Sequence, residues 1–363
     1  MKKVVKFGGS SLASAEQFQK VADIIHADPE RRYVVPSAPG KRFSGDTKVT
    51  DMLYSCYHLA EEGADFKKEL KAIAERYQEI IDGLSLSLSL ADEFKLIEKN
   101  FKEKTGENYA ASRGEYLNGI IIAAYLGYEF IDSAEVIRFK DNGEFDAEVT
   151  NEILSARLQD VEKAVVPGFY GAYADGRVKT FSRGGSDVTG SIVARAVKAD
   201  VYENWTDVSG FLIADPRIID QPEAIETITY RELRELSYMG ASVLHEDAIF
   251  PVRREGIPIN IRNTNSPEDT GTWIVESTCQ KCRYTITGVN LDEQGKPNRW
   301  KVENSWGKDN GEDGYYVASD AWFDRYVTEI IIRREYLDDA TLALLESEPV
   351  ELDPWQPLTK RCR

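Results

Sequence analysis

The chain has 363 residues, of which 42% are hydrophobic and 29% charged, a composition typical of a folded globular protein with one large domain or two ordinary ones. Its formal net charge of −17 disfavours a nucleic-acid partner, because most of such a surface repels a polyanion. No apolar run approaches the ~18 residues of a membrane span. Lys6 and the glycines after it lie where a signal peptide would need its apolar core. We therefore expect a cytoplasmic protein without membrane or nucleic-acid partners.

The four cysteines do not form the pattern of a disulfide scaffold or of a metal site. Cys279 and Cys282 are a C-x-x-C pair, but a zinc site would need a second pair or histidines nearby. We interpret them as free thiols and predict no protein-held metal.

The N-terminal segment has the pattern of a βαβ unit. Residues 2–7 are a short apolar strand that ends in Gly8 and Gly9. An amphipathic stretch with Phe18, Val21 and Ile24 at helical spacing follows and predicts a helix. Residues 33–37 are predicted to form a second strand. This order predicts a parallel sheet covered by helices.

Further elements follow along the chain. Residues 50–101 have a mainly helical pattern, interrupted at 84–90 by alternating Leu and Ser. We interpret this interruption as a loop between helices, because Gly83 precedes it and a helical pattern restarts at Ala91. An apolar helix is expected over 116–126, with Glu115 at its start. Strands are expected at 129–132, 164–170, 200–205 and 257–261.

The composition changes near residue 284. Four of the six tryptophans lie after this point, glycine, asparagine and tyrosine crowd 304–316, and the amphipathic α/β rhythm stops. We expect a boundary between two unrelated pieces there.

Two glycine turns could bind phosphate groups. In 6–11, glycines that leave a strand let backbone N–H groups approach phosphate oxygens, and Lys6 supplies a point charge. In 183–187, glycines open a helix between an arginine, which can grip a carboxylate, and an aspartate. The alternatives are an ordinary glycine turn for the first and a capped helix with a surface ion pair for the second.

Two more polar segments are candidates for ligand binding. Glu115 follows a Ser-Arg-Gly sequence, and its alternative interpretation is an acid in a first helical turn. Residues 206–217 follow a predicted parallel strand, where open α/β sheets bind ligands; the alternative is a polar turn. Together the four segments favour two substrates: a polyphosphate, and a small zwitterion that carries another group to be phosphorylated.

These segments resemble aspartate kinases in order and spacing over about 275 residues. The resemblance implies a three-layer α/β/α amino acid kinase fold with a mainly parallel central sheet, and a catalytic domain over 1–283. The segments that carry it are 6–11, 34–40, 112–115, 183–187, 206–217 and 239–245, with 260–275 closing the domain.

The resemblance also implies site residues. Lys6, Gly8, Gly9 and Ser10 would meet the ATP phosphates. Thr206, Asp207 and Arg217 would hold the nucleotide. Ser37, Thr50, Glu115, Arg183 and Ser186 would bind the substrate, with Glu115 on the ammonium group and Arg183 on the α-carboxylate. Lys6 and Asp187 would be catalytic, Asp187 as an orienting group. Ser242 replaces a lysine that the family often carries.

Residues 284–363 resemble a different family, the bleomycin hydrolase/aminopeptidase C group of papain-like cysteine peptidases. The blocks that carry this resemblance are 298–307 and 350–355. It implies a β-rich fragment of a papain-like fold in place of the ligand-sensing ACT domains usual in aspartate kinases. Asn304 lies where that family has its orienting asparagine, but no Gly-x-Cys-Trp motif precedes it. The chain is a hybrid: a natural fusion, an engineered chimera or a sequence assembly error.

The resemblance implies that the protein converts ATP and L-aspartate to ADP and 4-phospho-L-aspartate, the first step towards lysine, threonine and methionine. The expected cofactors are ATP and Mg²⁺. The oligomeric state stays open, with a homodimer as one alternative. The alternatives are a kinase of another acidic amino acid and an inactive kinase/peptidase hybrid.

Overall fold

The structure is a computed structural model that describes residues 1–182, 184–212, 224–233, 244, 250–275, 285–303, 312–326, 337–339 and 342. The chain divides into two compact units, Met1–Glu276 and Ser277–Arg363.

Within the described part of the first unit, eight strands form a central sheet in the order β3-β4-β2-β1-β7-β9-β10-β8. The pairs on both sides of β1 are parallel, and the β9–β10 pair is antiparallel, which confirms the predicted mainly parallel sheet. The strands are β1 Lys3–Phe7, β2 Arg31–Pro36, β3 Glu129–Phe130, β4 Ala164–Val165, β7 Val201–Thr206, β8 Thr227–Thr229, β9 Ile259–Asn263 and β10 Thr272–Val275.

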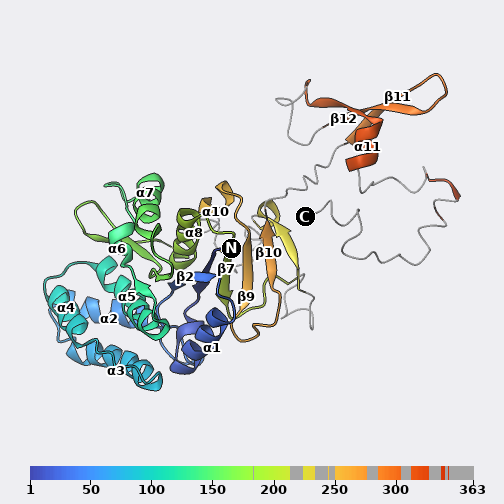
Figure 1. The fold of residues 1–363 in the computed structure, drawn as a ribbon. Coiled ribbons are helices and arrows are strands. Elements are labelled where there is room, and N and C mark those ends of the chain that lie inside the picture. Colours follow the sequence, from blue (N-terminus) through green and yellow to red (C-terminus); the bar gives the residue numbers. More distant parts are fainter. Residues whose placement is uncertain are drawn as a thin grey trace. The chain divides into compact units, whose positions relative to one another are not determined.

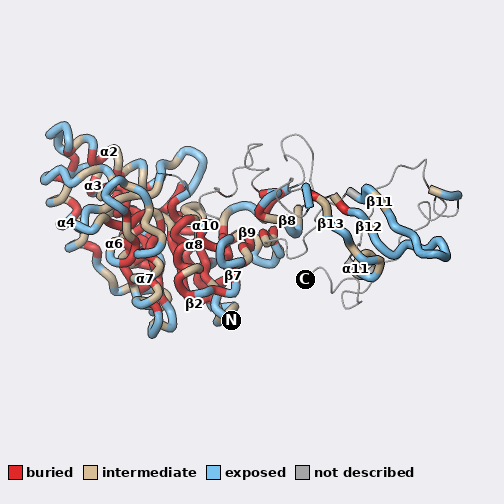
Figure 2. Tube along the Cα trace, turned by 90° about the horizontal axis from the view of Figure 1, so that it is seen from above, coloured by how far each residue is buried: buried red, intermediate tan, exposed pale blue. Residues whose placement is uncertain are grey.

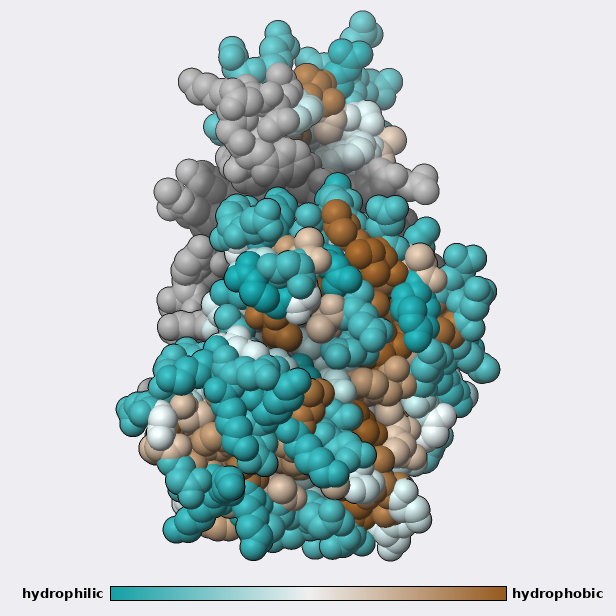
Figure 3. Space-filling view, turned by 90° about the vertical axis from the view of Figure 1, so that its left-hand side faces the viewer, coloured by the Kyte–Doolittle hydropathy of each residue, from teal (hydrophilic) through white to brown (hydrophobic). Residues whose placement is uncertain are grey.

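Helices cover both faces of this sheet (Figure 1). One layer contains the α1, α2, α3, α4 and α5 helices, and the other contains α6, α7, α8 and α10. Their bounds, with the short η1 turn, are η1 Ser10–Leu12, α1 Ala15–His26, α2 Val49–Glu62, α3 Lys67–Gly83, α4 Ala91–Lys102, α5 Glu107–Leu126, α6 Ser133–Val136, α7 Ala147–Leu158, α8 Gly185–Val197 and α10 Phe250–Arg254. Hydrophilic residues cover most of the face that α2 to α7 present (Figure 3). In the described residues, no helix combines the length and the apolar character of a membrane span.

Side chains alternate along β1 and divide the core into two layers. Val4 packs in the cluster with α7, α8 and α10, whereas Val5 and Phe7 pack in the cluster with α1, α2 and α5. Period-two alternation in a strand places Lys6 on the same face as Val4, beneath α8. The buried residues of the first unit concentrate in this sheet and the helices packed on it (Figure 2).

A buried charged cluster lies on the opposite face of β7. Glu203 accepts hydrogen bonds from Arg31 Nε and from the indole N–H of Trp205, both 2.8 Å long. The Trp205 ring also contacts two guanidinium groups, with distances to the ring centroid of 5.2 Å for Arg31 and 4.7 Å for Arg262. Each buried charge is thus paired or placed over an aromatic face.

The loop predicted over 84–90 is confirmed, because α3 ends at Gly83 and α4 begins at Ala91. The single strand predicted over 164–170 is wrong. Its first part is β4, and its last residue begins β5 Tyr170–Ala172, which forms a separate hairpin with β6 Val178–Thr180. Between them Pro167 has no N–H for a strand ladder, and Phe169 has a left-handed φ of 80°.

The second unit contains an antiparallel sheet of β11 Thr285–Leu291, β12 Pro297–Glu303 and β13 Tyr315–Ser319, followed by α11 Asp320–Tyr326. The predicted β-rich C-terminal piece is confirmed. Trp300 stacks on Phe323 with ring centroids 4.3 Å apart, and its indole N–H donates to Asp320. Among the described hydrophobic residues of this unit, only Val302 is buried.

Candidate functional site

The carboxyl ends of three neighbouring parallel strands define the candidate site. Phe7 at the end of β1 lies in register with Pro36 of β2 on one side and Trp205 of β7 on the other. The chain passes from β1 to β2 on one side and returns as β7 on the other, so this is a topological switch point, where open α/β sheets bind ligands. Every predicted site residue in the described part of the chain lies on these strands, in the turns that follow them, or on helices α2, α5 and α8.

The first turn brings two glycines into backbone contact. Gly9 O accepts a hydrogen bond of 2.8 Å from Gly40 N. A Cβ atom on Gly9 would lie 2.8 Å from Ala38 O, and one on Gly40 would lie 2.6 Å from the Gly9 carbonyl carbon. Only glycine fits this close approach. Gly8 N donates to Trp205 O at 2.9 Å, and Ser10 begins η1.

Lys6 and Asp187 form an ion pair across this edge of the sheet. Lys6 Nζ lies 2.6 Å from Asp187 Oδ1, and Lys6 is only 8% exposed. Asp187 is in the first turn of α8, which follows Gly184 in the left-handed region at φ 56°. The neighbouring Ser186 packs against Gly168, where a Cβ atom would lie 2.5 Å from Ser186 Oγ.

Glu115 lies in the middle of α5, not at the start of a helix as the sequence predicted. The pattern hid the first turns of α5, because 107–114 contains polar residues and a glycine. The Glu115 carboxylate accepts a hydrogen bond from Ala38 N–H, and its Oε2 has no partner among the described residues. Burial raises its pKa to about 8, against smaller opposing effects of that hydrogen bond and of Arg113.

Ser37 and Thr50 both lie next to helix α5. Ser37 follows β2, where its N–H donates to Phe7 O and its carbonyl accepts from Asn118 Nδ2. Thr50 is in the first turn of α2, with its Oγ1 3.7 Å from the position of a Cβ on Gly114.

Thr206 and Asp207 lie on the other side of the glycine turn. Thr206 ends β7, and its Cα lies 4.0 Å from the position of a Cβ on Gly8. Its hydroxyl donates to Asp207 Oδ1 at 3.2 Å. The predicted site residues Arg183 and Arg217, with Ser242 and Asn304, lie outside the described residues.

The amino acid kinase family profile matches residues 1–263. The chain belongs to the amino acid kinase family. Residues 273–359 match the peptidase C1-like family, so the second predicted resemblance is also shown.

Similar proteins place this amino acid kinase among the aspartokinases. It is 44% identical to aspartokinase 3 of Bacillus subtilis over 309 residues, which cover 80% of this chain and 67% of the relative. A crystal structure of Clostridium acetobutylicum aspartate kinase has 53% identity and a TM-score of 0.74, over 80% of this chain and 66% of that one. Escherichia coli aspartokinase III in complex with aspartate and ADP has 26% identity and a TM-score of 0.67, over 82% of this chain and 68% of that one. The chain therefore spans about two thirds of the length of these relatives.

Two residues of this amino acid kinase site were missed by the sequence analysis. Asn204, in the middle of β7, hydrogen-bonds both Lys6 and Asp187. Arg76 of α3 is buried and donates to the carbonyls of Gly40 and Thr47, which anchors the loop between β2 and α2. A polar residue inside an apolar strand was the available signal for Asn204, whereas nothing in the charged helical pattern around Arg76 distinguishes it.

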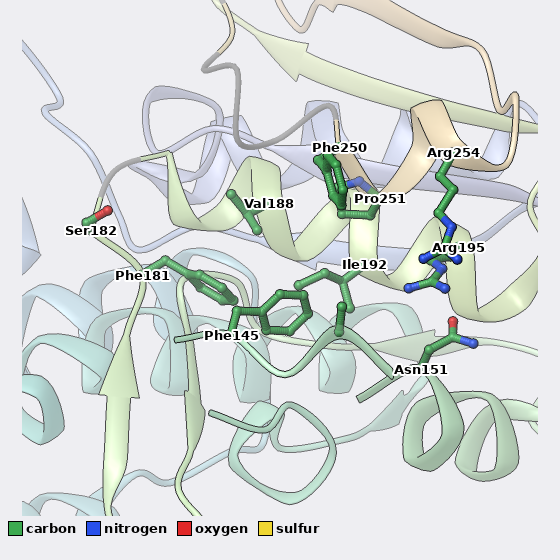
Figure 4. A pocket seen from close by; sticks show the side chains of 11 residues that line it. Phe145, Asn151, Phe181, Ser182, Val188, Ile192, Arg195, Phe250, Pro251 and Arg254 are labelled. Atoms are coloured by element: carbon green, nitrogen blue, oxygen red, sulfur yellow. The ribbon is translucent and has the colours of Figure 1, made fainter. Parts of the chain in front are cut away.

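A cavity of the kinase unit is separate from this site. It has a volume of about 410 Å³ and a mainly apolar lining that includes Phe145, Phe181 and Phe250 (Figure 4). Helix α8 borders both places, because Val188 and Ile192 line the cavity, whereas Asp187 contacts Lys6. None of the predicted site residues is among its described lining residues.

Proposed function

We propose that this protein is an aspartate kinase that transfers the γ-phosphoryl group of ATP to the β-carboxylate of L-aspartate, the first step towards lysine, threonine and methionine. The observation that carries the proposal is the Lys6–Asp187 pair at the carboxyl ends of β1 and β7, beside a turn whose Gly9 leaves no room for a side chain. The proposal is supported by the similarity to aspartokinases, one of which was solved with aspartate and ADP.

Two groups of residues would bind the two substrates. Gly8, Gly9 and Ser10 would meet the ATP phosphates, with the N–H groups of Gly9 and Ser10 as donors, because the Gly8 N–H already donates to Trp205 O. Thr206, Asp207 and Arg217 would hold the rest of the nucleotide. Aspartate would lie toward Ser37, Thr50, Glu115, Arg183 and Ser186. The buried Glu115 carboxylate, with one oxygen unpartnered among the described residues, suits the substrate ammonium group.

The reaction needs no strong general base. The nucleophile is a carboxylate with an ordinary pKa of ~3.9, so it is already ionised at neutral pH. Catalysis then depends on positioning the two substrates and on neutralising the charge of the transferring group. Lys6 would supply that positive charge, and Asp187 would orient Lys6.

Magnesium fits this site as a partner of ATP. Among the described residues there is no group of three or more His, Cys, Asp or Glu side chains that could hold a metal. Mg²⁺ is commonly held by one or two carboxylates together with substrate phosphates. Asp187 and Asp207 are the carboxylates beside the glycine turn that could contribute, and bound Mg²⁺ would neutralise phosphate charge.

The test is a hydroxylamine-trapping assay with aspartate and magnesium ATP, which converts an acyl phosphate to a hydroxamate that is measured as its coloured ferric complex. We expect hydroxamate with aspartate and much less with glutamate or acetylglutamate. Preference for one of the latter would identify a kinase of another acidic amino acid. Absence of hydroxamate with all three, in a folded protein, would indicate an inactive hybrid.

We further propose that the catalytic domain comprises residues 1–283 and that residues 284–363 have no peptidase activity. The supporting observation is that the orienting asparagine of the peptidase block has no accompanying cysteine motif in the sequence.

A cytoplasmic location and a homodimer are further parts of the proposal. Sedimentation of the purified chain would test the dimer.

A further inference from the structure

Asn204 is a buried polar residue on the face of the sheet that contacts α8. It is 3% exposed and lies in register with Lys6, one strand away. A buried amide is unfavourable unless its donor and acceptor are both hydrogen-bonded. An amide at this position therefore needs a specific pair of partners.

Those partners are the two members of the ion pair. Asn204 Nδ2 donates to Asp187 Oδ1 at 2.9 Å, and Lys6 Nζ donates to Asn204 Oδ1 at 3.4 Å. An amide presents a donor at one end and an acceptor at the other, so it matches a carboxylate beside an ammonium group. The reverse orientation would place like-signed groups together.

Two further observations describe how β7 holds this end of α8. The Tyr202 hydroxyl, on the same face of β7, donates to the Asp187 backbone carbonyl at 3.1 Å. Asp187 Oδ1 is occupied by Lys6 and Asn204, while Oδ2 has no hydrogen-bond partner among the described residues and the side chain keeps 16% exposure. In the described part of the chain, the titratable groups that face Asn204 are Lys6 from β1, Asp187 from α8 and Tyr202 from β7.

We propose that Asn204 is a positioning residue for phosphoryl transfer, which fixes Asp187 Oδ1 and Lys6 Nζ so that the remaining Lys6 hydrogens and Asp187 Oδ2 stay available to the substrates. This inference rests on the proposed kinase activity. A side chain without the amide would let the carboxylate rotate and engage Lys6 with both oxygens. A second carboxylate would draw Lys6 away from the phosphoryl group.

Two substitutions test the inference. Asn204→Leu should lower kcat by about 10-fold to 100-fold, because small displacements of catalytic groups reduce rates this much, while KM for aspartate should change by less than about 2-fold. Asn204→Asp should also lower kcat, because the introduced carboxylate would draw Lys6 away from the phosphoryl group.

Asn260→Leu is the matched control. Asn260 is a buried asparagine on the adjacent strand β9, and it donates to the backbone carbonyls of Thr270 and Thr272. Its loss should lower the melting temperature and leave kcat per folded molecule unchanged. Wild-type kcat in Asn204→Leu or in Asn204→Asp, or an equal kcat loss in Asn260→Leu, would overturn the proposal.

A crystallographic measurement separates this inference from the proposed function. If the wild type forms no hydroxamate, the activity proposal fails, but the geometry can still be compared. In crystals of Asn204→Leu the Asp187 carboxylate should rotate relative to Lys6. If Asn204→Leu does not fold, crystals of Asn204→Asp at high pH serve instead, where Lys6 should shift toward residue 204. Unchanged positions of Lys6 and Asp187 in the variant would refute a positioning role.

Discussion

Glu115 is a carboxylate whose surroundings favour its neutral form until a cation arrives. Burial raises its pKa to about 8, and one of its oxygens has no partner among the described residues. An ammonium group placed there would stabilise the ionised carboxylate and release the proton. Aspartate binding should therefore be coupled to the ionisation of Glu115.

This coupling predicts a pH-dependent KM for aspartate. Only the ionised carboxylate attracts the ammonium group, and its fraction falls about 10-fold per pH unit below the pKa. KM for aspartate should rise as the pH falls from 8 to 6, whereas KM for ATP should stay nearly constant. In Glu115→Gln, KM for aspartate should be high and independent of pH. Steady-state kinetics across this range would contradict the role of Glu115 if the variant retained the wild-type pH dependence.

The same pKa predicts how the stability of the ligand-free protein changes with pH. The folded-state pKa of about 8 lies above the ordinary value of 4.5, so the folded state binds the proton more tightly than the unfolded state. This contribution to stability is fully present below pH 4.5 and is lost as the pH rises to about 8. Glu115→Gln should remove that loss, which is on the order of a few kcal/mol. Denaturant unfolding of the wild type and of Glu115→Gln at pH 5 and pH 8 measures this change in the free energy of unfolding. An equal change in both proteins would contradict the prediction.

The charge of Lys6 gives a prediction about turnover. Lys6→Ala removes the point charge beside the glycine turn and should lower kcat on the order of 10²-fold or more. The hydroxamate assay at saturating substrates measures this effect. Surface Lys95→Ala is a suitable control, because Lys95 pairs with Asp92 within α4, far from the glycine turn in sequence. Unchanged turnover in Lys6→Ala would refute the assigned role.

At the scale of elements, the site depends on two loops that touch without side chains. The close approach of Gly9 and Gly40 joins the β1–α1 turn to the β2–α2 loop, and Arg76 anchors the second loop from α3. The proposed ATP and aspartate sides of the site would therefore share one backbone contact. A change there should affect both substrates.

Gly40→Ala tests that contact. Its Cβ would lie 2.6 Å from Gly9 C and 2.7 Å from Ser10 N, so one loop must move. We expect activity to fall by about 10-fold or more, with raised KM for both ATP and aspartate. Gly45→Ala in the same loop is the control, because its nearest neighbour is a Phe43 ring atom at 3.7 Å. Equal kinetics of the two variants would show that the contact does not position the loops.

The sequence predicted the elements whose patterns are local. The β1–α1–β2 unit and the loop over 84–90 follow from apolar spacing and glycines. The start of α5 was hidden because 107–114 contains polar residues and a glycine, and Pro167 was a local sign that the strand at 164 ends early. The role of Asn204 depends instead on packing between distant segments, since its partners lie 17 and 198 residues away in sequence.

For the whole molecule, the two units differ in how completely their apolar residues are covered. The first unit has two large buried clusters, one on each face of its sheet. In the second, Ile286, Val289, Leu291 and Val317 are exposed, with Val317 at 71%. Small units with few buried apolar residues are marginally stable.

Limited proteolysis should therefore cut first after about residue 276 and leave a kinase fragment. Epoxysuccinyl peptides, which label active cysteine peptidases, should not modify the protein. Mass spectrometry of the fragments and of the treated chain would measure both outcomes. Initial cleavage within 1–276, or stoichiometric labelling of a cysteine, would contradict these expectations.

The charged cluster around Trp205 has a spectroscopic consequence. Trp205 is 1% exposed, lies against two guanidinium groups and is followed directly by Thr206 at the proposed nucleotide site. Its carbonyl also accepts the N–H of Gly8, so its backbone is part of the glycine turn. An indole held in this environment is a built-in optical probe: its emission should respond to nucleotide binding without any attached dye. Trp205→Phe would identify how much of the signal comes from this ring.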